Sequence, residues 1–128
     1  MDQRREQSDK YRHRRYNRQR TDKREQQFYK SRQWEQLRQY LAGYYHGLCV
    51  YSYLVEHKIV PYYTMHHIIP VKDDWSKRFN SNCIIPLCES VHQRVEKAYR
   101  EGRKKETQEQ LFELLKRWRD GAGGTEKV

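Results

Sequence analysis

The sequence predicts a small protein of the α+β class. Three observations support this prediction. The chain has 128 residues, which is the usual length of one domain. Two short apolar segments, 64–71 and 83–87, flank a polar stretch that is rich in turn-forming residues. Other stretches carry apolar residues at the three- and four-residue spacing that is typical of a helix buried on one side.

The composition narrows the class of protein. Lys and Arg number 27 against 17 Asp and Glu, so the formal net charge is +10. A positive excess of this size favours a polyanionic partner, most simply a nucleic acid. The chain contains no run of about 18 apolar residues, the length needed to span a membrane. No apolar segment follows the basic start, as one would in a signal peptide. Because three cysteines also argue against a disulfide framework, we expect a cytoplasmic protein without a membrane partner.

Residues 1–26 form a basic segment ahead of the predicted domain. Residues 1–25 hold ten basic and five acidic residues and almost no aliphatic side chain. Such a segment cannot bury enough surface to offset its ordering entropy, so we expect a flexible or helical arm. It either lies along phosphates or is a solvated tail. In the first interpretation, the phosphate contacts are Arg12, Arg14, Arg15, Arg18 and Arg20.

The first helix of the domain is predicted from the spacing of Trp34, Leu37 and Leu41, which share one helical face. Ser31 is suited to cap its start and Gly43 to end it. These signals place the beginning of the folded domain, 27–119, close to residue 27.

The middle of the chain has the pattern of a hairpin. Residues 44–63 are rich in Tyr, Val, Leu and Cys but are interrupted by Gly and Pro, which predicts loops and short extended segments. Segments 64–71 and 83–87 then pair as two strands, joined by the polar, turn-forming stretch 73–82.

Two helices are predicted after the hairpin. Residues 89–100 repeat apolar side chains at helical spacing, and Gly102 ends the helix. The last helix is expected to start at Thr107, with Gln110 completing a capping box. Its apolar face consists of Leu111, Leu114, Leu115 and Trp118. Residues 120–128 are then a flexible tail.

The candidate functional residues are two adjacent histidines on the first predicted strand and a third histidine one turn into the following helix. Phosphodiester hydrolysis needs a base that works near neutral pH and a cation that neutralises developing charge. Imidazole has an unperturbed pKa of about 6.5, which suits the first task. Adjacent side chains of a strand point to opposite sides, so His66 can bind a metal ion while His67 faces another part of the site. His92 on the following helix can complete the metal site.

Each of these residues also has a plainer interpretation. A histidine pair on a strand can simply be buried and hydrogen-bonded, and His92 alone can be a surface residue of a helix. Asp73 and Asp74 can be a metal-binding pair, although a solvated turn is the favoured interpretation of that loop.

The combination of motifs resembles the HNH endonucleases, most closely the small HNH proteins of bacteriophages. The resemblance rests on His66-His67-Ile-Ile-Pro, the polar loop through Asn80-Ser-Asn82, and the run Ile85-Pro-Leu-Cys-Glu-Ser-Val-His92. It covers roughly residues 27–100. The family implies a ββα-metal (His-Me finger) core with flanking helices, in which a hairpin and a helix hold one divalent ion.

The resemblance also implies roles for individual residues. His66 and His92 correspond to metal ligands and His67 to the general base. The family asparagine that orients the base corresponds to either Asn82, which we favour as catalytic, or the position of Cys83. By ligand softness, two imidazoles suit Mn²⁺, Ni²⁺ or Zn²⁺ better than Mg²⁺, which its abundance keeps as a candidate.

Many relatives hold a structural zinc ion with two Cys-x-x-Cys pairs. Here Cys49 and Cys88 match the first member of each pair, but Ser52 and Val91 replace the second. Because valine cannot ligate a metal ion and serine is a poor zinc ligand, no structural zinc is predicted. Both cysteines are instead expected to be buried as small hydrophobic residues.

The predicted function is therefore a metal-dependent endonuclease that hydrolyses DNA one strand at a time with weak sequence preference. The resemblance also suggests a role with a phage packaging terminase, in the cytoplasm of a host cell. The alternative is a DNA-binding accessory protein with impaired catalysis, and a basic RNA-binding protein is a third possibility. The phosphate contacts expected near the motif are Lys72, Lys77, Arg78, Arg94 and Lys97.

Overall fold

A computed structural model of the chain describes residues 23–122. The chain divides into two compact units, 1–35 and 36–128, which are treated separately below. The arginines predicted as phosphate contacts of the basic arm lie outside the described residues, as does 123–128.

The described part of the first unit is an aromatic turn between two helical segments. Residues 23–29 are helical, and α2 (Arg32–Tyr44) begins in this unit and ends in the next. The ring of Phe28 lies 4.9 Å from that of Tyr29 and 5.2 Å from that of Trp34. The Ser31 hydroxyl accepts a hydrogen bond from the Trp34 amide at 3.2 Å, which confirms the predicted N-cap.

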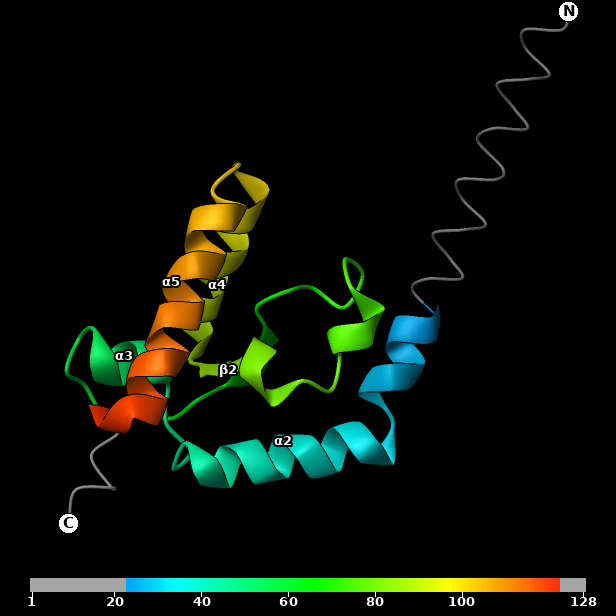
Figure 1. Cartoon of the computed structure of the whole chain (residues 1–128), viewed down its shortest axis with the longest axis horizontal. Helices are drawn as coiled ribbons and strands as arrows, with labels where there is room; N and C mark the ends of the chain where they lie inside the picture. The colour runs from blue at the N-terminus through cyan, green and yellow to red at the C-terminus, as the bar shows by residue number, and fades with distance from the viewer. Residues whose placement is uncertain (1–22, 123–128) are drawn as a thin grey trace, which may run out of the picture. The chain divides into compact units, whose positions relative to one another are not determined.

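The predicted hairpin is present in the second unit. Strands β1 (Thr64–His67) and β2 (Ile84–Leu87) pair antiparallel, with Thr64 opposite Leu87 and His67 opposite Ile84 (Figure 1). The strands are flanked by buried apolar residues, and the Ile68 amide still donates to the Cys83 carbonyl beyond the last pair. Two 3₁₀ turns, η1 (Trp75–Lys77) and η2 (Ser81–Cys83), shape the long connection.

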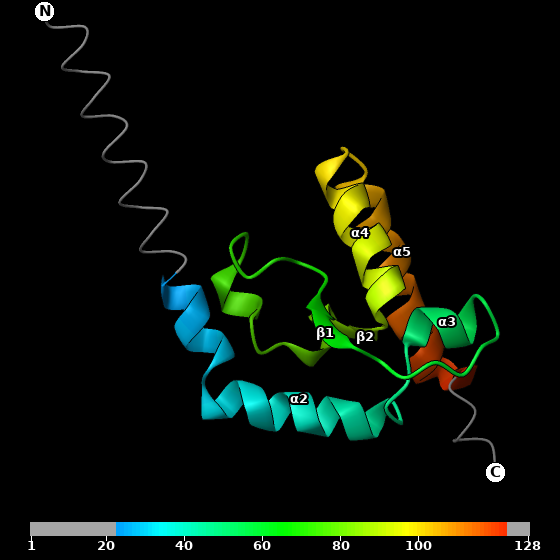
Figure 2. The same ribbon diagram turned by 180° about the vertical axis from the view of Figure 1, so that it is seen from behind.

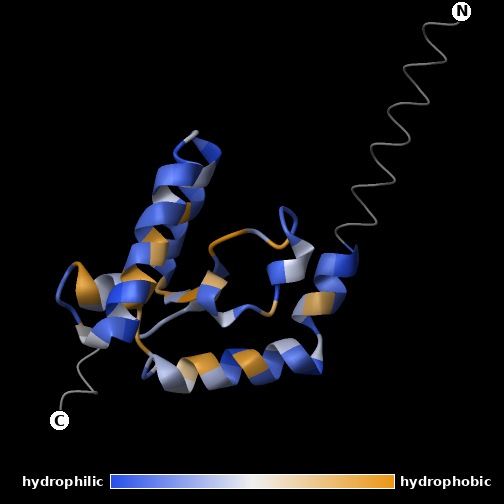
Figure 3. Ribbon diagram, in the orientation of Figure 1, coloured by the Kyte–Doolittle hydropathy of each residue, from blue (hydrophilic) through white to orange (hydrophobic). Residues whose placement is uncertain are grey.

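Two helices follow the hairpin and run side by side. They are α4 (Glu89–Arg100) and α5 (Lys104–Arg117), and both views show them adjacent (Figure 2). Hydrophilic residues cover much of their length, with hydrophobic bands between them (Figure 3). The four residues of the predicted apolar face of α5 are all buried, as the sequence predicted: Leu111, Leu114, Leu115 and Trp118.

The predicted start of α5 is wrong by three residues. The helix begins at Lys104, so Thr107 lies inside its first turn. The Thr107 hydroxyl donates to the Arg103 carbonyl at 2.6 Å, and this bond to the preceding turn replaces the capping contact that its sequence position suggested. After α5 the helical turn η3 (Trp118–Ala122) contains Gly121 at a φ of 104°, a conformation that favours glycine.

Helix α3 (Val50–Leu54) was not predicted, because its sequence Val-Tyr-Ser-Tyr-Leu is typical of a strand. The Cys49 sulfur accepts a hydrogen bond from the Ser52 amide at 3.5 Å and so caps the helix. Val50 and Leu54 are buried, which adds the packing that overrides local propensity. Nowhere in 23–122 is there a helix of the length and hydrophobicity needed to cross a membrane.

Candidate active site

Three side chains from β1 and α4 converge beside the hairpin. His66 on β1 is buried, and its Nδ1 lies 3.6 Å from Glu96 Oε1. His92 and Glu96 are four residues apart on α4 and therefore share one face of the helix. His92 Nε2 lies 3.3 Å from the same carboxylate oxygen. We call His66, His92 and Glu96 the imidazole–carboxylate cluster.

The dimensions of this cluster suit one metal ion. The three potential ligand atoms all lie within 4.8 Å of one another. Ligands at about 2.0–2.2 Å from a shared ion can be at most about 4.4 Å apart, and both distances to the Glu96 oxygen satisfy this limit. Two imidazoles and a carboxylate are also ordinary ligands of divalent transition-metal ions.

The protonation state of His66 agrees with a ligand role. Burial, followed by the nearby imidazoles of His92 and His67, lowers the pKa of His66 to about 3. The ring is therefore neutral at physiological pH and keeps a lone pair, which is the form that binds metal ions.

His67 is held differently from its neighbour. Its Nε2 lies 2.9 Å from the carbonyl oxygen of Arg78, in the loop between the strands. A carbonyl only accepts hydrogen bonds, so Nε2 carries the proton and Nδ1 carries the lone pair of the neutral ring. Burial lowers the pKa of His67, and the bond to Arg78 opposes this effect only in part. A neutral imidazole of fixed tautomer is suited to accept a proton.

Asn82, predicted as the residue that orients the base, contacts Arg119 in this structure. Its carboxamide oxygen accepts a hydrogen bond from the Arg119 guanidinium at 3.3 Å, and the side chain is exposed. Together with three tyrosines, these two residues line a cavity of about 190 Å³. The group that holds the His67 ring is the backbone carbonyl of Arg78. Cys83, the other candidate for the family asparagine, is buried.

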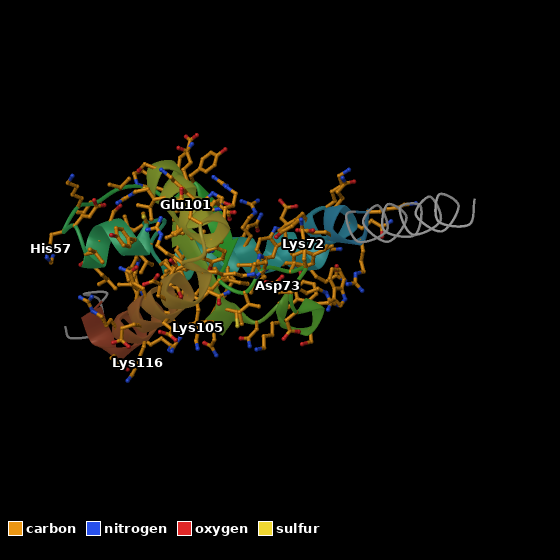
Figure 4. All side chains as sticks on the ribbon, turned by 90° about the horizontal axis from the view of Figure 1, so that it is seen from above. His57, Lys72, Asp73, Glu101, Lys105 and Lys116 are labelled. Carbon is orange, nitrogen blue, oxygen red and sulfur yellow. The ribbon has the colours of Figure 1, made fainter. Side chains whose placement is uncertain are left out.

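The basic residues predicted to contact DNA differ in their surroundings. Lys72 is exposed on the loop between the strands (Figure 4). The guanidinium of Arg78 lies over the Trp75 ring at 4.3 Å, so this side chain packs on its own loop. Ion pairs with neighbouring carboxylates are made by Lys77 with Asp74, Arg94 with Glu56 and Lys97 with Glu101.

The acidic pair of the same loop has structural partners. Asp73 forms an ion pair with Lys104 of α5. Asp74 caps η1, because its carboxylate accepts a hydrogen bond from the Ser76 amide at 3.1 Å. Both contacts fit the interpretation of this loop as a polar turn.

A second cluster, the thiol cluster of Cys49, Ser52 and Cys88, lies at the start of α4. The Ser52 hydroxyl lies 3.7 Å from the Cys88 sulfur. Burial raises the pKa of Cys88, but hydrogen bonds from Ser90, the Val91 amide, Ser52 and Cys49 outweigh it and lower the pKa overall. Both cysteines are buried, yet Cys88 is hydrogen-bonded more extensively than a purely hydrophobic residue would be.

Two residues of the site were missed by the sequence analysis. Glu96 follows His92 by one helical turn, and Tyr99 lies one further turn along the same face of α4. The Tyr99 hydroxyl lies 3.3 Å from His66 Nε2. The signal was the spacing 92, 96 and 99 within an already predicted helix.

Comparison with solved structures identifies the family. The chain is similar to the structure described as the HNH endonuclease of the deep-sea thermophilic bacteriophage GVE2, with manganese ion. The two share 32% sequence identity with a TM-score of 0.62, over 69% of this chain and 94% of the other. This chain belongs to the HNH endonuclease family. No family model matches the sequence, and the search of curated proteins finds no match.

Membership of the HNH family explains the arrangement of the hairpin and helix α4. The hairpin β1–β2 and helix α4 form the ββα-metal core, so the predicted fold class and family are both confirmed. The relationship supports a nuclease function, and the imidazole–carboxylate cluster is a possible metal site of this HNH protein.

Proposed function

We propose that this HNH protein is a metal-dependent endonuclease that hydrolyses phosphodiester bonds in DNA. The observation that carries the proposal is the convergence of His66, His92 and Glu96 beside a second imidazole, His67, of fixed tautomer. A nuclease of this type needs both parts, a cation site and a base.

His66, His92 and Glu96 would hold the divalent ion. When bound, such an ion supplies Lewis-acid stabilisation of the negative charge on the phosphate and on the leaving 3′ oxygen. The added carboxylate makes the site harder than two imidazoles alone, which favours Mn²⁺ within the predicted set of Mg²⁺, Mn²⁺, Ni²⁺ and Zn²⁺. The similar bacteriophage enzyme was crystallised with manganese, which supports this choice.

His67 acts as the general base in the proposed reaction. Its Nδ1 accepts a proton from the water that attacks the phosphorus in line. The Arg78 carbonyl keeps the other ring proton on Nε2 and so prevents the ring from presenting the wrong nitrogen. The products expected from the family chemistry are a 5′-phosphate and a 3′-hydroxyl.

Basic side chains around the motif would position the DNA. Lys72, Arg94 and Lys97 are exposed and suited to contact phosphates, which fix the orientation of a duplex but carry no sequence information. Weak sequence preference and strong salt dependence follow from such contacts. A single site cuts one strand at a time. An association with a packaging terminase stays a prediction from the resemblance.

The test is nicking of supercoiled plasmid with Mn²⁺ or Mg²⁺. We expect His67→Ala to reduce the nicking rate by about 10²–10⁴-fold, which is the usual contribution of a general base, with DNA binding retained. The matched control is His57→Ala, because His57 is exposed on a different loop and should be dispensable (Figure 4). DNA binding without nicking at every metal ion tested would instead support the accessory protein. The hydrogen bond of the Asn82 carboxamide to Arg119 is the observation that favours that alternative.

A further inference from the structure

A short chain of hydrogen bonds connects the first metal-ligand candidate to the backbone of the hairpin. The Tyr99 hydroxyl lies 2.7 Å from the Ile68 carbonyl oxygen and 3.3 Å from His66 Nε2. Tyr99 comes from α4, whereas His66 and Ile68 belong to β1 and its continuation. The contact therefore joins the two halves of the ββα-metal core.

The donors and acceptors in this chain follow from the Ile68 carbonyl at its end. A carbonyl oxygen only accepts, and a tyrosine hydroxyl has one proton, so that proton points to Ile68. The hydroxyl can then interact with His66 only as an acceptor. His66 must donate from Nε2, and the lone pair of its neutral ring is consequently on Nδ1.

Nδ1 is the nitrogen that faces the imidazole–carboxylate cluster. It lies 3.6 Å from Glu96 Oε1, the oxygen that is also 3.3 Å from His92 Nε2. The opposite tautomer would place a proton between His66 and the ion. That proton would have to leave Nδ1 before binding, which weakens the affinity for the metal ion.

The acceptor at the end of the chain is itself fixed. Gln108 Nε2 from α5 donates to the same Ile68 carbonyl at 2.9 Å, and the Ile68 amide donates to Cys83 at 2.8 Å. Ile68 is fully buried. The carbonyl oxygen therefore keeps its direction, and through Tyr99 so does the proton on His66.

We propose that Tyr99 is a positioning residue that selects the Nε2–H tautomer of His66 and thereby presents Nδ1 to a divalent cation. This inference rests on the metal site of the proposed function. It adds Tyr99 as a residue that contacts the metal ligand His66 rather than the metal ion or the DNA. Histidine ligands of metal ions are commonly oriented by such a partner on the other ring nitrogen, and its loss typically weakens metal binding about 10–100-fold.

The competing explanation is that Tyr99 only packs α4 against the hairpin. Its ring lies 5.5 Å from the His66 ring in an edge-on arrangement, and this contact survives in Tyr99→Phe. Gln108→Ala is the matched control, because it removes the other donor to Ile68 and a hydrogen bond to Tyr99 but leaves the Tyr99 hydroxyl itself in place. Comparing the two variants separates loss of the hydroxyl from general disturbance of the Ile68 carbonyl.

The experiment has two measurements on the full chain. The first is the histidine tautomer of the metal-free protein, read from ¹⁵N chemical shifts at neutral pH. We expect Nε2–H for His66 in the wild type and in Gln108→Ala, and a mixture in Tyr99→Phe. The second is calorimetric titration with Mn²⁺. We expect a dissociation constant about 10–100-fold higher for Tyr99→Phe and within about threefold of wild type for Gln108→Ala.

Several results would overturn the inference. A wild-type His66 protonated on Nδ1 would do so without any variant, even if Tyr99→Phe failed to fold. An unchanged tautomer and Mn²⁺ affinity in Tyr99→Phe, or equal losses in both variants, would also reject it. If the wild type nicks DNA and Tyr99→Phe leaves the Mn²⁺ affinity unchanged, this inference fails and the proposed function stands. If the wild type binds no divalent ion, both fail.

Discussion

The imidazole–carboxylate cluster and the thiol cluster both use residues of the segment 88–96 but have different chemistry. Cys88 caps α4, and His92 lies one turn further along that helix. In the first cluster, three potential ligand atoms converge within 4.8 Å. In the second, two thiols lie with a serine hydroxyl, and Val91, three residues after Cys88, is buried.

The two clusters stabilise their part of α4 in different ways. In the thiol cluster, the hydrogen bond between Ser52 and Cys88 joins α3 to the start of α4, and Val91 is buried. In the imidazole–carboxylate cluster, two imidazoles and a carboxylate are stabilised most when a cation joins them.

The largest effect is expected when the thiol cluster is converted into a metal site, like the imidazole–carboxylate cluster. Ser52→Cys with Val91→Cys restores four thiols, and we expect the double variant to bind one Zn²⁺. The gain in free energy of unfolding should be on the order of 5 kcal/mol, less than the roughly 10–16 kcal/mol of zinc-finger peptides because this region is already packed. Urea unfolding with and without Zn²⁺ measures it.

The metal-free form of the double variant is the control for this measurement. With a chelator present it should be about 1 kcal/mol less stable than the wild type, because Val91→Cys removes buried packing. Failure to take up zinc, with the fold intact, would show that the thiol cluster no longer has the geometry of a metal site.

The second effect concerns the ligand that was missed from the sequence. Glu96→Gln removes the charge shared by the two histidines, and we expect Mn²⁺ affinity to fall about 100-fold, or about 2.7 kcal/mol. Glu89→Gln is the matched control, because Glu89 is exposed in the first turn of the same helix. Equal affinity for both variants would remove Glu96 from the ligand set.

The features of this molecule differ in how well the sequence predicts them, because different interactions stabilise them. The hairpin, α4 and the apolar face of α5 depend on periodicity and turn residues. Helix α4 and the second strand were predicted to within one residue, whereas the first strand, predicted as 64–71, ends at His67. Helix α3 depends on a sulfur cap and burial, so its strand-like composition was misleading. The His67 ring is held by a backbone carbonyl, which no side-chain pattern could indicate.

The third effect is acid sensitivity of the metal-free protein, to which His66 of the imidazole–carboxylate cluster should contribute most and the buried His67 should add. The folded chain keeps His66 neutral down to a pKa of about 3, whereas the unfolded chain binds a proton near pH 6.5. Between these values the unfolded state binds more protons, so stability is present above pH 6.5 and is lost as the pH falls. We expect a slope of about 1.4 kcal/mol per pH unit from this group.

Urea unfolding with a chelator between pH 7.5 and 4.5 tests this expectation. His66→Gln should flatten the slope, whereas His57→Gln, at an exposed position, should leave it unchanged. An equal slope in wild type and His66→Gln would assign the acid sensitivity to other groups.

The smallest effect is expected at Asn82, which belongs to neither cluster. Its carboxamide contacts Arg119, and the carbonyl of Arg78 already holds the His67 ring. Asn82→Ala should therefore change the nicking rate by less than about threefold, or about 0.6 kcal/mol in activation free energy. Arg119→Ala removes the other partner of the same contact and should behave alike. A loss of more than about 30-fold confined to Asn82→Ala would mean that the carboxamide turns toward His67 when DNA binds, because only then could it orient the base.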